Sequence, residues 1–98
     1  MNEDVINVMP TDLLIAEVKR ICIENNVKHL TLIGSFATGT QTLRSDMDFA
    51  VYGCEDYMKL EEEIDSIETL RKIDLFDADR ICNEYLLEDI AKYGKPIY

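Results

Sequence analysis

Basic residues are scarce in this sequence: 10 Lys and Arg stand against 20 Asp and Glu among 98 residues, a formal net charge of −10. Proteins that bind nucleic acid non-specifically or dock on anionic membranes need the opposite balance, so the composition argues against both classes. The excess acid fits a cation-binding site, a basic protein partner or simple solubility. It is also uneven, because residues 1–45 carry 5 acidic and 4 basic side chains, whereas residues 46–98 carry 15 and 6.

Long apolar runs and cysteine pairs are also missing. No run approaches the roughly 18 apolar residues that span a membrane, and no signal-peptide pattern opens the chain, so we expect neither feature. Cys22, Cys54 and Cys82 are far apart and form no C-x-x-C, which disfavours a disulfide framework and a zinc site. Reduced thiols are typical of the cytosol, so we expect a cytoplasmic protein.

The chain reads as a single domain over residues 1–98, since it contains no repeat or linker and is short for more than one core. Residues 1–9 read as a loose lead-in to this domain. The predicted elements are a helix from Pro10 to Asn25-Asn26 with Thr11 as N-cap, strands over 28–33, 48–52 and 72–76, and helices over 57–70 and 83–93, the last stopped by Gly94 and Pro96. This order predicts an α/β domain with a small mixed sheet and helices mainly on one face.

Residues 29–43 contain no Asp, Glu, Lys or Arg, which is unusual in a chain that is 31% charged. Within this stretch Gly34 and Ser35 end a predicted strand, and Asp46-x-Asp48 opens the next strand ten residues later. Because it has no Cβ, Gly34 lets a ligand approach the backbone closely. If a helix starts at Ser35, its free N–H groups and the serine hydroxyl form an anion site, for which phosphate is the natural occupant.

Asp46 and Asp48 stand two apart on a predicted strand, so their side chains leave the same face with Cα atoms roughly 6.6 Å apart. Carboxylates in this arrangement can converge on Mg²⁺, which prefers oxygen ligands. Met47, Phe49 and Val51 then point to the opposite face, into the core. A phosphate site beside paired carboxylates favours phosphoryl or nucleotidyl transfer. The alternative is a Gly-Ser turn and two surface aspartates.

The Gly-Ser step and the Asp-x-Asp pair together resemble the signature of the minimal nucleotidyltransferases of the DNA polymerase β-like superfamily. This family has a third carboxylate between hydrophobic residues on a later strand, where this chain has Asp74 between Ile73 and Leu75. The last helix and the tail over residues 94–98 are also similar to the family's ending. The resemblance covers most of the chain, about residues 12–98, and implies the polymerase β-like nucleotidyltransferase fold.

By this resemblance Asp46, Asp48 and Asp74 are the catalytic residues and hold two Mg²⁺ ions. Gly34 and Ser35 hold the triphosphate of ATP or another nucleoside triphosphate. Asp74 also assists deprotonation of an acceptor hydroxyl, which attacks the α-phosphorus while pyrophosphate leaves. The resemblance thus implies an enzyme, a Mg²⁺-dependent nucleotidyltransferase that moves a nucleoside monophosphate, AMP from ATP, to a hydroxyl acceptor.

One departure concerns the residues that follow the Gly-Ser step. Many relatives carry a basic residue there, which lends positive charge to the triphosphate, but this chain has Phe36, Ala37 and Thr38. Arg44, Lys72 or a side chain of a partner are the candidates to replace that charge. Without a replacement, we expect weak or partner-dependent activity.

The resemblance also implies a partner. Relatives of this size pair with a small all-helical protein of the HEPN class in toxin–antitoxin pairs, and some add AMP to a tyrosine of the toxin. A HEPN-type partner or a second copy of this chain is therefore expected to supply the acceptor site. Two alternatives stay open: a non-catalytic antitoxin that neutralises a helical partner by contact, and an antibiotic-modifying enzyme, which the short length disfavours.

Five further features have a functional and a structural interpretation. Ser45, counted with the nucleotide-binding residues, either fixes the turn before the aspartates or contacts the ligand directly. For His29 and Asp77 a structural or solvated role is favoured over a role in the site. The acidic helix face over residues 61–68 is either solvated or docks a basic partner, and Tyr98 either packs on the core or contacts a partner.

Overall fold

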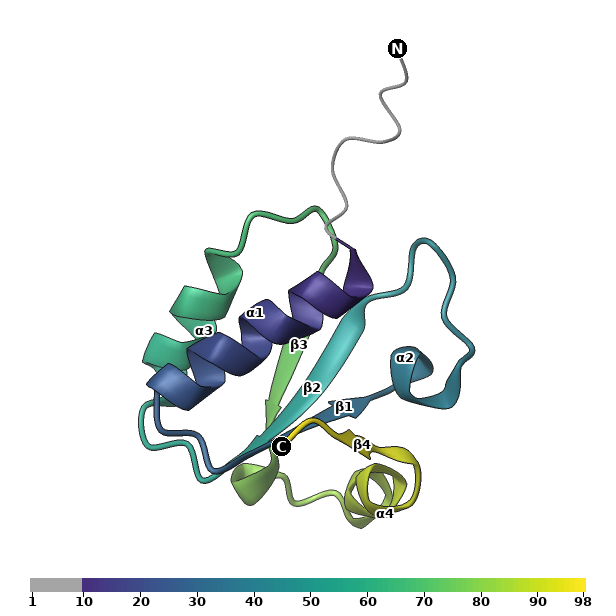
Figure 1. Cartoon of the computed structure of the whole chain (residues 1–98). Coiled ribbons are helices and arrows are strands. Elements are labelled where there is room, and N and C mark those ends of the chain that lie inside the picture. Colours follow the sequence, from purple (N-terminus) through teal and green to yellow (C-terminus); the bar gives the residue numbers. More distant parts are fainter. Residues whose placement is uncertain (1–9) are drawn as a thin grey trace.

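The computed structural model describes residues 10–98, so the lead-in expected over residues 1–9 lies outside the described part. The elements are α1 Thr11–Glu24, β1 His29–Ile33, α2 Ser35–Thr38, β2 Met47–Tyr52, α3 Tyr57–Asp65, β3 Ile73–Asp77, the 3₁₀ helix η2 Ala78–Arg80, α4 Glu84–Tyr93 and β4 Lys95–Pro96. The strands form one mixed sheet in the order β3-β2-β1-β4. The predicted fold class is therefore confirmed (Figure 1).

The sheet combines antiparallel and parallel pairing. β1 is antiparallel to both β2 and β4, whereas β2 is parallel to β3, and α3 makes the crossover that a parallel pair requires. Figure 1 shows α1 and α3 together on one face of the sheet and α4 on the other. None of the helices within residues 10–98 has the length and apolar character needed to cross a membrane.

The larger hydrophobic core lies between the sheet and the pair α1 and α3. Met47, Phe49 and Val51 of β2 are fully buried in it, as the alternation of the strand predicts. Leu30 and Leu32 of β1 join them from the neighbouring strand. Because side chains alternate along a strand, Asp48 and Ala50 of β2 are turned toward the α4 face, where a smaller cluster that includes Ala50 lies.

The third helix is shorter than predicted, since α3 ends at Asp65 and not near residue 70. The hydroxyl of Ser66 donates to the carbonyl of Glu63 at 2.6 Å. A serine that bonds to a nearby backbone carbonyl in this way favours a helix end. Ile67, beyond the end of the helix, still packs partly buried against the core. The chain then crosses to β3 through residues 66–72.

The N-cap of the first helix lies one residue earlier than predicted. Pro10 and not Thr11 is the N-cap: its backbone is extended, and its carbonyl accepts the first helical bond from Leu14 N at 2.9 Å. Pro10 has no side-chain cap bond, so the predicted hydroxyl cap of Thr11 is wrong. The predicted end at the two asparagines is confirmed, with Asn26 in the left-handed region at φ 61°.

A short strand after the last helix was not predicted from the sequence. Gly94 ends α4 as expected, but its backbone is extended, and β4 then pairs antiparallel with β1. Ile97 N donates to Leu30 O at 2.7 Å, which continues the pairing. Pro96 is compatible with this strand because β4 is at the edge of the sheet, where one N–H is not needed.

Tyr98 packs on the core, which decides between its two expected roles in favour of the structural one. Its hydroxyl donates to the carbonyl of Val27 at 2.8 Å, and its own carbonyl accepts from Leu30 N at 3.1 Å. Burial raises the pKa of the Tyr98 phenol to about 12. The final described residue is thus bonded to both ends of the segment that enters β1.

We predict that Asn83→Ala destabilises the domain by about 1 kcal/mol, because Asn83 is the N-cap of α4 and not its first residue as predicted. Its side-chain oxygen accepts from Tyr85 N at 3.0 Å and Leu86 N at 3.2 Å. Urea unfolding measures the effect. Asn83→Asp is the control, since it keeps an acceptor at the cap, and equal destabilisation by both changes would contradict the prediction.

Candidate active site

The Gly-Ser step and the Asp-x-Asp pair meet in the structure. Gly34 has φ 71° and ψ −152°, a conformation open essentially to glycine alone, and it caps the single turn of α2. A Cβ at Gly34 would lie only 2.5 Å from Oδ2 of Asp48. Glycine is thus required here both by the backbone and by the close approach of this carboxylate.

The helix that follows Gly34 is a single turn of four residues. Phe36 and Ala37 bury its inner side in the main core, while Ser35, its first residue, is half-buried. Ala37 N and Thr38 N donate to the Gly34 carbonyl at 3.0 and 3.2 Å. Because the helix is so short, any attraction for an anion rests on local N–H groups and the Ser35 hydroxyl, not on the dipole of a long helix.

Asp48 and Asp74 form a carboxylate pair across the parallel strands. They are register partners in β2 and β3, and both side chains leave the α4 face of the sheet. Burial raises the pKa of the Asp48 carboxyl to about 6, and the charge of Asp74, a hydrogen bond to Asp74 and the charge of Asp46 act in the same direction. Two acids in such contact favour either a shared proton or a cation.

Asp46 is placed differently from the other two predicted ligands. It precedes β2 by one residue and its side chain is exposed. Within residues 10–98, no three His, Cys, Asp or Glu side chains lie close enough together to form a ready-made metal site. The structure therefore brings Asp48 and Asp74 together and leaves Asp46 at the rim. Lys72 Nζ lies 3.7 Å from Asp74 Oδ1 and supplies the positive charge near this pair.

Ser45 fixes the turn that leads to Asp46. Its hydroxyl accepts from Thr42 N at 2.8 Å, while Ser45 N donates to Thr42 O at 3.2 Å. The Thr42 hydroxyl in turn accepts from Arg44 N at 3.3 Å. These bonds confirm the turn-fixing alternative for Ser45; its direct contact with a nucleotide stays a prediction.

A cavity of about 240 Å³ opens beside Asp48, between α2, the sheet and α4. Its polar side is formed by Gly34, Thr38 and Asp48, and its apolar side is formed by β1, β3 and α4. The contribution of α4 was not predicted, although its lining residues recur at helical spacing. These residues are Leu86, Asp89, Ile90 and Tyr93, and Asp89 adds a second carboxylate to the cavity lining beside Asp48. The cavity thus offers an acidic end and an aromatic wall to one ligand.

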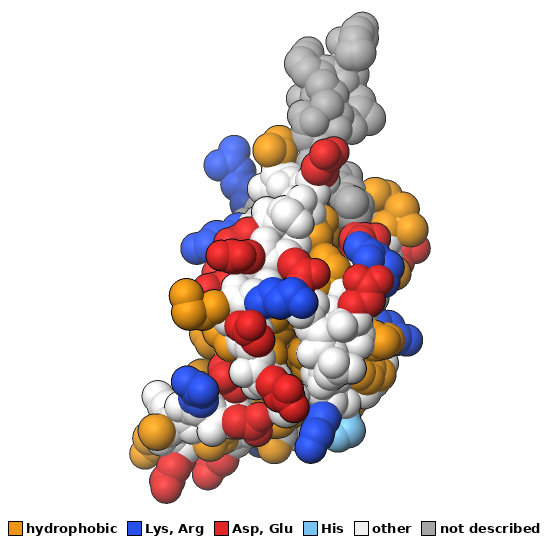
Figure 2. Space-filling model, turned by 90° about the vertical axis from the view of Figure 1, so that its left-hand side faces the viewer, with side chains coloured by type: hydrophobic (Ala, Val, Ile, Leu, Met, Phe, Trp, Pro, Cys, Tyr) orange, Lys and Arg blue, Asp and Glu red, His pale blue; other side chains and the backbone are white. Residues whose placement is uncertain are grey.

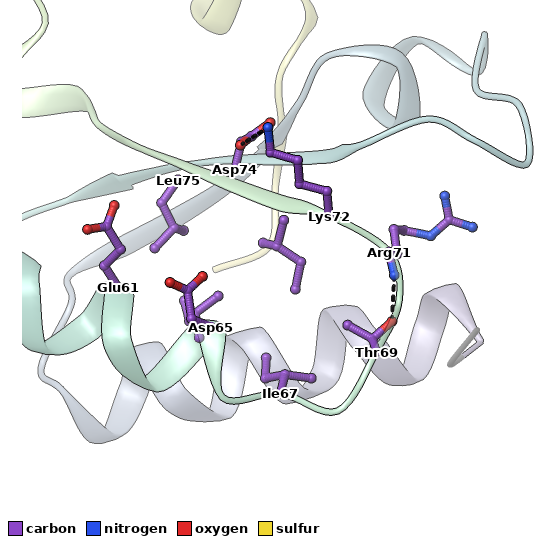
Figure 3. Close-up of a pocket in the computed structure, with 10 residues that line it drawn as sticks. Glu61, Asp65, Ile67, Thr69, Arg71, Lys72, Asp74 and Leu75 are labelled. Atoms are coloured by element: carbon purple, nitrogen blue, oxygen red, sulfur yellow. Dashed lines mark hydrogen bonds and ion pairs between the residues drawn. The ribbon is translucent and has the colours of Figure 1, made fainter. Parts of the chain in front are cut away.

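A second cavity, of about 330 Å³, lies on the α1 and α3 side, between α3 and the free edge of β3. Figure 3 shows Glu61 and Asp65 on its α3 side and Lys72 reaching to Asp74 above them. Of the predicted site residues only Asp74 lines this cavity, and no glycine lines it. The smaller cavity is lined by both Gly34 and Asp48, whereas Asp74, the partner of Asp48, lines the second cavity. The smaller cavity is therefore the candidate active site.

The secondary candidates have structural roles. Asp77 caps η2 by accepting from Asp79 N at 3.3 Å, and its other oxygen lies 3.5 Å from Arg80 Nε. His29 is exposed at the start of β1, opposite Tyr52 and at the far end of that strand from the glycine. Neither position adds a group to the cavity beside α4.

The acidic face of α3 is mostly exposed. Figure 2, which views the molecule from the α3 side, shows acidic side chains with Lys and Arg dispersed among them. Glu63 is the exception, because it is half-buried and accepts from Asn25 Nδ2 at 3.1 Å, tying α3 to the end of α1. The mixed charges agree with the solvated interpretation of this face.

The fold and the site together define a nucleotidyltransferase domain of the polymerase β type. The sequence profile of the family described as "Polymerase beta, Nucleotidyltransferase" matches residues 16–98. The chain therefore belongs to this family, as its resemblance to the minimal nucleotidyltransferases implied. A search of curated proteins gave no match.

Solved structures with this fold include three toxin–antitoxin crystal structures. One, a toxin–antitoxin with AMP-PNP, has a TM-score of 0.67 and 22% identity, covering 85% of this chain and 71% of that chain. A MntA-HpeT mutant with two aspartate-to-glutamate changes gives 0.66 and 20%, with 85% and 71% covered. A MntA-HpeT mutant with a tyrosine-to-alanine change gives 0.65 and 24%, with 92% and 73% covered. At these identities the likeness establishes the shared fold.

Proposed function

We propose that this chain is a Mg²⁺-dependent nucleotidyltransferase that transfers AMP from ATP to a hydroxyl of a partner protein, as the antitoxin of a toxin–antitoxin pair. The observation that carries the proposal is the contact of Asp48 with Gly34 on one side and Asp74 on the other. It places paired carboxylates directly beside the turn expected to hold phosphates. Membership of the nucleotidyltransferase family supports the reaction type.

The residues of the site fit a divalent cation. Two carboxylates in contact repel each other when both are ionised, and this repulsion adds to the effect of burial in raising the pKa of Asp48. A cation held by Asp48 and Asp74, joined by Asp46, relieves it, and oxygen ligands of this kind suit Mg²⁺. When bound, Mg²⁺ supplies charge neutralisation to the phosphates and to the attacking and leaving oxygens.

The protein's own groups then divide the remaining work. The first turn of α2 and the Ser35 hydroxyl bind phosphate oxygens, and Gly34 lets the chain of phosphates approach the backbone. The acceptor oxygen bonds to the α-phosphorus, the bond to pyrophosphate breaks, and Asp74 accepts the proton of the hydroxyl. The α4 wall of the cavity, with Tyr93, excludes water from one side of the ligand.

The partner is supported by the proteins that share the fold. Among them are a toxin–antitoxin with AMP-PNP and two MntA-HpeT mutants, one with two aspartate changes two positions apart. The same spacing separates Asp46 from Asp48. We propose that a helical HEPN-type toxin provides the acceptor, with a tyrosine as the receiving residue.

The test is transfer of label from ATP in the presence of Mg²⁺ and the proposed toxin partner, taken as the product of the gene adjacent to the one that encodes this chain. We expect label from the α-phosphate, and none from the γ-phosphate, to appear on the partner, because AMP is transferred and pyrophosphate leaves. Mass spectrometry of the partner then locates the modified hydroxyl. Transfer of γ-label, or no transfer over a range of Mg²⁺ and nucleotides, would contradict the proposal.

A second candidate function is neutralisation by contact without catalysis. It is favoured by Phe36, which stands where a basic residue would assist the triphosphate and is buried in the core. Cells that express the toxin with an Asp46→Asn/Asp48→Asn variant distinguish the two. Full protection by this variant favours contact, whereas loss of protection with a retained complex favours AMP transfer.

A further inference from the structure

Arg71 is a charged side chain that contacts two other segments of the site, and no sequence pattern pointed to it. It lies in the connection between α3 and β3, three residues before Asp74. Its guanidinium carbon lies 4.9 Å from the centre of the Phe36 ring, and its NH1 group donates to the carbonyl of Ser45 at 2.7 Å. Figure 3 shows it pointing away from Glu61 and Asp65.

These contacts fall next to three functional positions. Phe36 directly follows Ser35, Ser45 directly precedes Asp46, and Arg71 itself leads into the strand that carries Asp74. Between the single turn of α2 and the start of β2, the chain forms no helix or strand. Arg71 contacts Phe36 at one end of this stretch and Ser45 at the other. It therefore controls the distance between the phosphate turn and the exposed Asp46.

The chemistry of arginine suits this place. The ring face of Phe36 attracts a guanidinium, and a hydrogen bond from a charged donor is stronger than one between neutral groups. The Nε atom of Arg71 is buried and has no hydrogen-bond partner among the described residues. An unsatisfied buried donor costs free energy, so the contacts of Arg71 with Phe36 and Ser45 must offset that cost.

We propose that Arg71 is a positioning residue that holds Ser35 and Asp46 in register with Asp74. The inference rests on the proposed nucleotide transfer and adds the side chain that assembles its three segments. Arg71 stacks on Phe36, one of the three residues that stand where many relatives carry a basic residue, so the Phe36 ring binds a guanidinium supplied from another segment.

The experiment compares Arg71→Met, Arg71→Lys and Arg80→Met in the full chain. Methionine keeps length and apolar bulk, lysine restores a cation, and Arg80, which is 83% exposed and pairs with Asp77, is the matched control. We expect Arg71→Met to lower kcat by about 10²-fold with KM for ATP within about threefold, since misplaced groups act mainly in the transition state. Arg71→Lys should recover part of kcat, and Arg80→Met should leave it unchanged.

A readout that needs no activity accompanies the kinetics. Amide hydrogen exchange over residues 42–46 should accelerate about tenfold in Arg71→Met and not in Arg80→Met, at equal distance from the melting temperature of each variant. Unchanged exchange there would overturn the inference, as would a wild-type kcat in Arg71→Met. A wild-type chain that transfers no label would instead overturn the proposed function, while the exchange measurement still decides the role of Arg71.

Discussion

Asp48→Asn is expected to abolish nucleotide transfer and, in the absence of metal, to make the protein more stable. Loss of one carboxylate that holds the cation removes several kcal/mol of transition-state stabilisation, and every 1.36 kcal/mol is a factor of ten in rate. We therefore expect activity to fall by at least about 10³-fold. The opposite sign of the stability change follows from the burial of Asp48 and from its contact with Asp74, both of which disfavour the ionised carboxylate.

The stability change depends on pH in a defined way. The pKa of Asp48 is raised from its ordinary 3.8 to about 6, so the folded protein binds more protons than the unfolded chain between these values. Stability contributed by this group therefore falls as pH rises from about 4 to about 6. Asparagine carries no charge, so the variant does not undergo this loss. We expect its free energy of unfolding above pH 6 to exceed that of the wild type by about 1–2 kcal/mol after allowance for solvent screening.

Thermal unfolding in a chelator at pH 4, 5, 6 and 7.5 measures this effect. The two proteins should melt together near pH 4 and diverge as pH rises to about 6, with the variant higher and the difference nearly constant above that pH. Added Mg²⁺ should raise the melting temperature of the wild type only. A variant that melts below the wild type at pH 7.5 without metal would show that the Asp48 carboxylate is satisfied by protein groups, and that no cation is needed there.

Gly34→Ala is expected to inactivate the protein and to destabilise it by about 3 kcal/mol or more. The backbone at Gly34 lies in a region that costs other residues about 1–3 kcal/mol. In addition, the new methyl group would meet the Asp48 carboxylate at 2.5 Å, so the carboxylate must leave its place beside Asp74. Activity is lost because the group that moves is a predicted cation ligand.

Gly39→Ala is the matched control within the same segment. Gly39 also has a positive φ, 78°, but a Cβ there would have no atom within 4 Å. We expect this change to cost about 1–2 kcal/mol from backbone strain alone and to leave kcat nearly unchanged. Equal effects of the two alanine substitutions on kcat, at a temperature where both variants are folded, would mean that the approach of Asp48 to Gly34 has no catalytic importance.

The parts of the site that obey local rules could be predicted from the sequence. The Gly-Ser step after a strand predicted that another group approaches the glycine backbone closely. The two aspartates flanking Met47 predicted a strand with one polar and one apolar face. Both features are present. Asp46 was expected on the strand, but β2 starts one residue later because Met47 N is the first group bonded to the neighbouring strand, through Lys72 O at 2.9 Å.

The parts that depend on distant segments could not be predicted. Arg71 meets Phe36 and Ser45 only after the parallel crossover has brought β3 beside β2. The pairing of β4 with β1 likewise depends on where α4 lies, since two residues with a proline carry no strand pattern of their own. Tyr93 gave no signal by itself, and its place in the cavity follows from the packing of α4 on the sheet.

The position of β3 at the edge of the sheet has a consequence for how this protein loses activity on warming. Asp74 lies on a strand with a neighbour on one side only, whereas Asp48 lies on an interior strand. Edge elements detach by local opening at a smaller free energy than global unfolding requires. Warming should therefore switch the catalyst off below the temperature at which circular dichroism reports melting, and cooling should restore it. Inactivation and melting that coincide would show that β3 opens only with the whole domain.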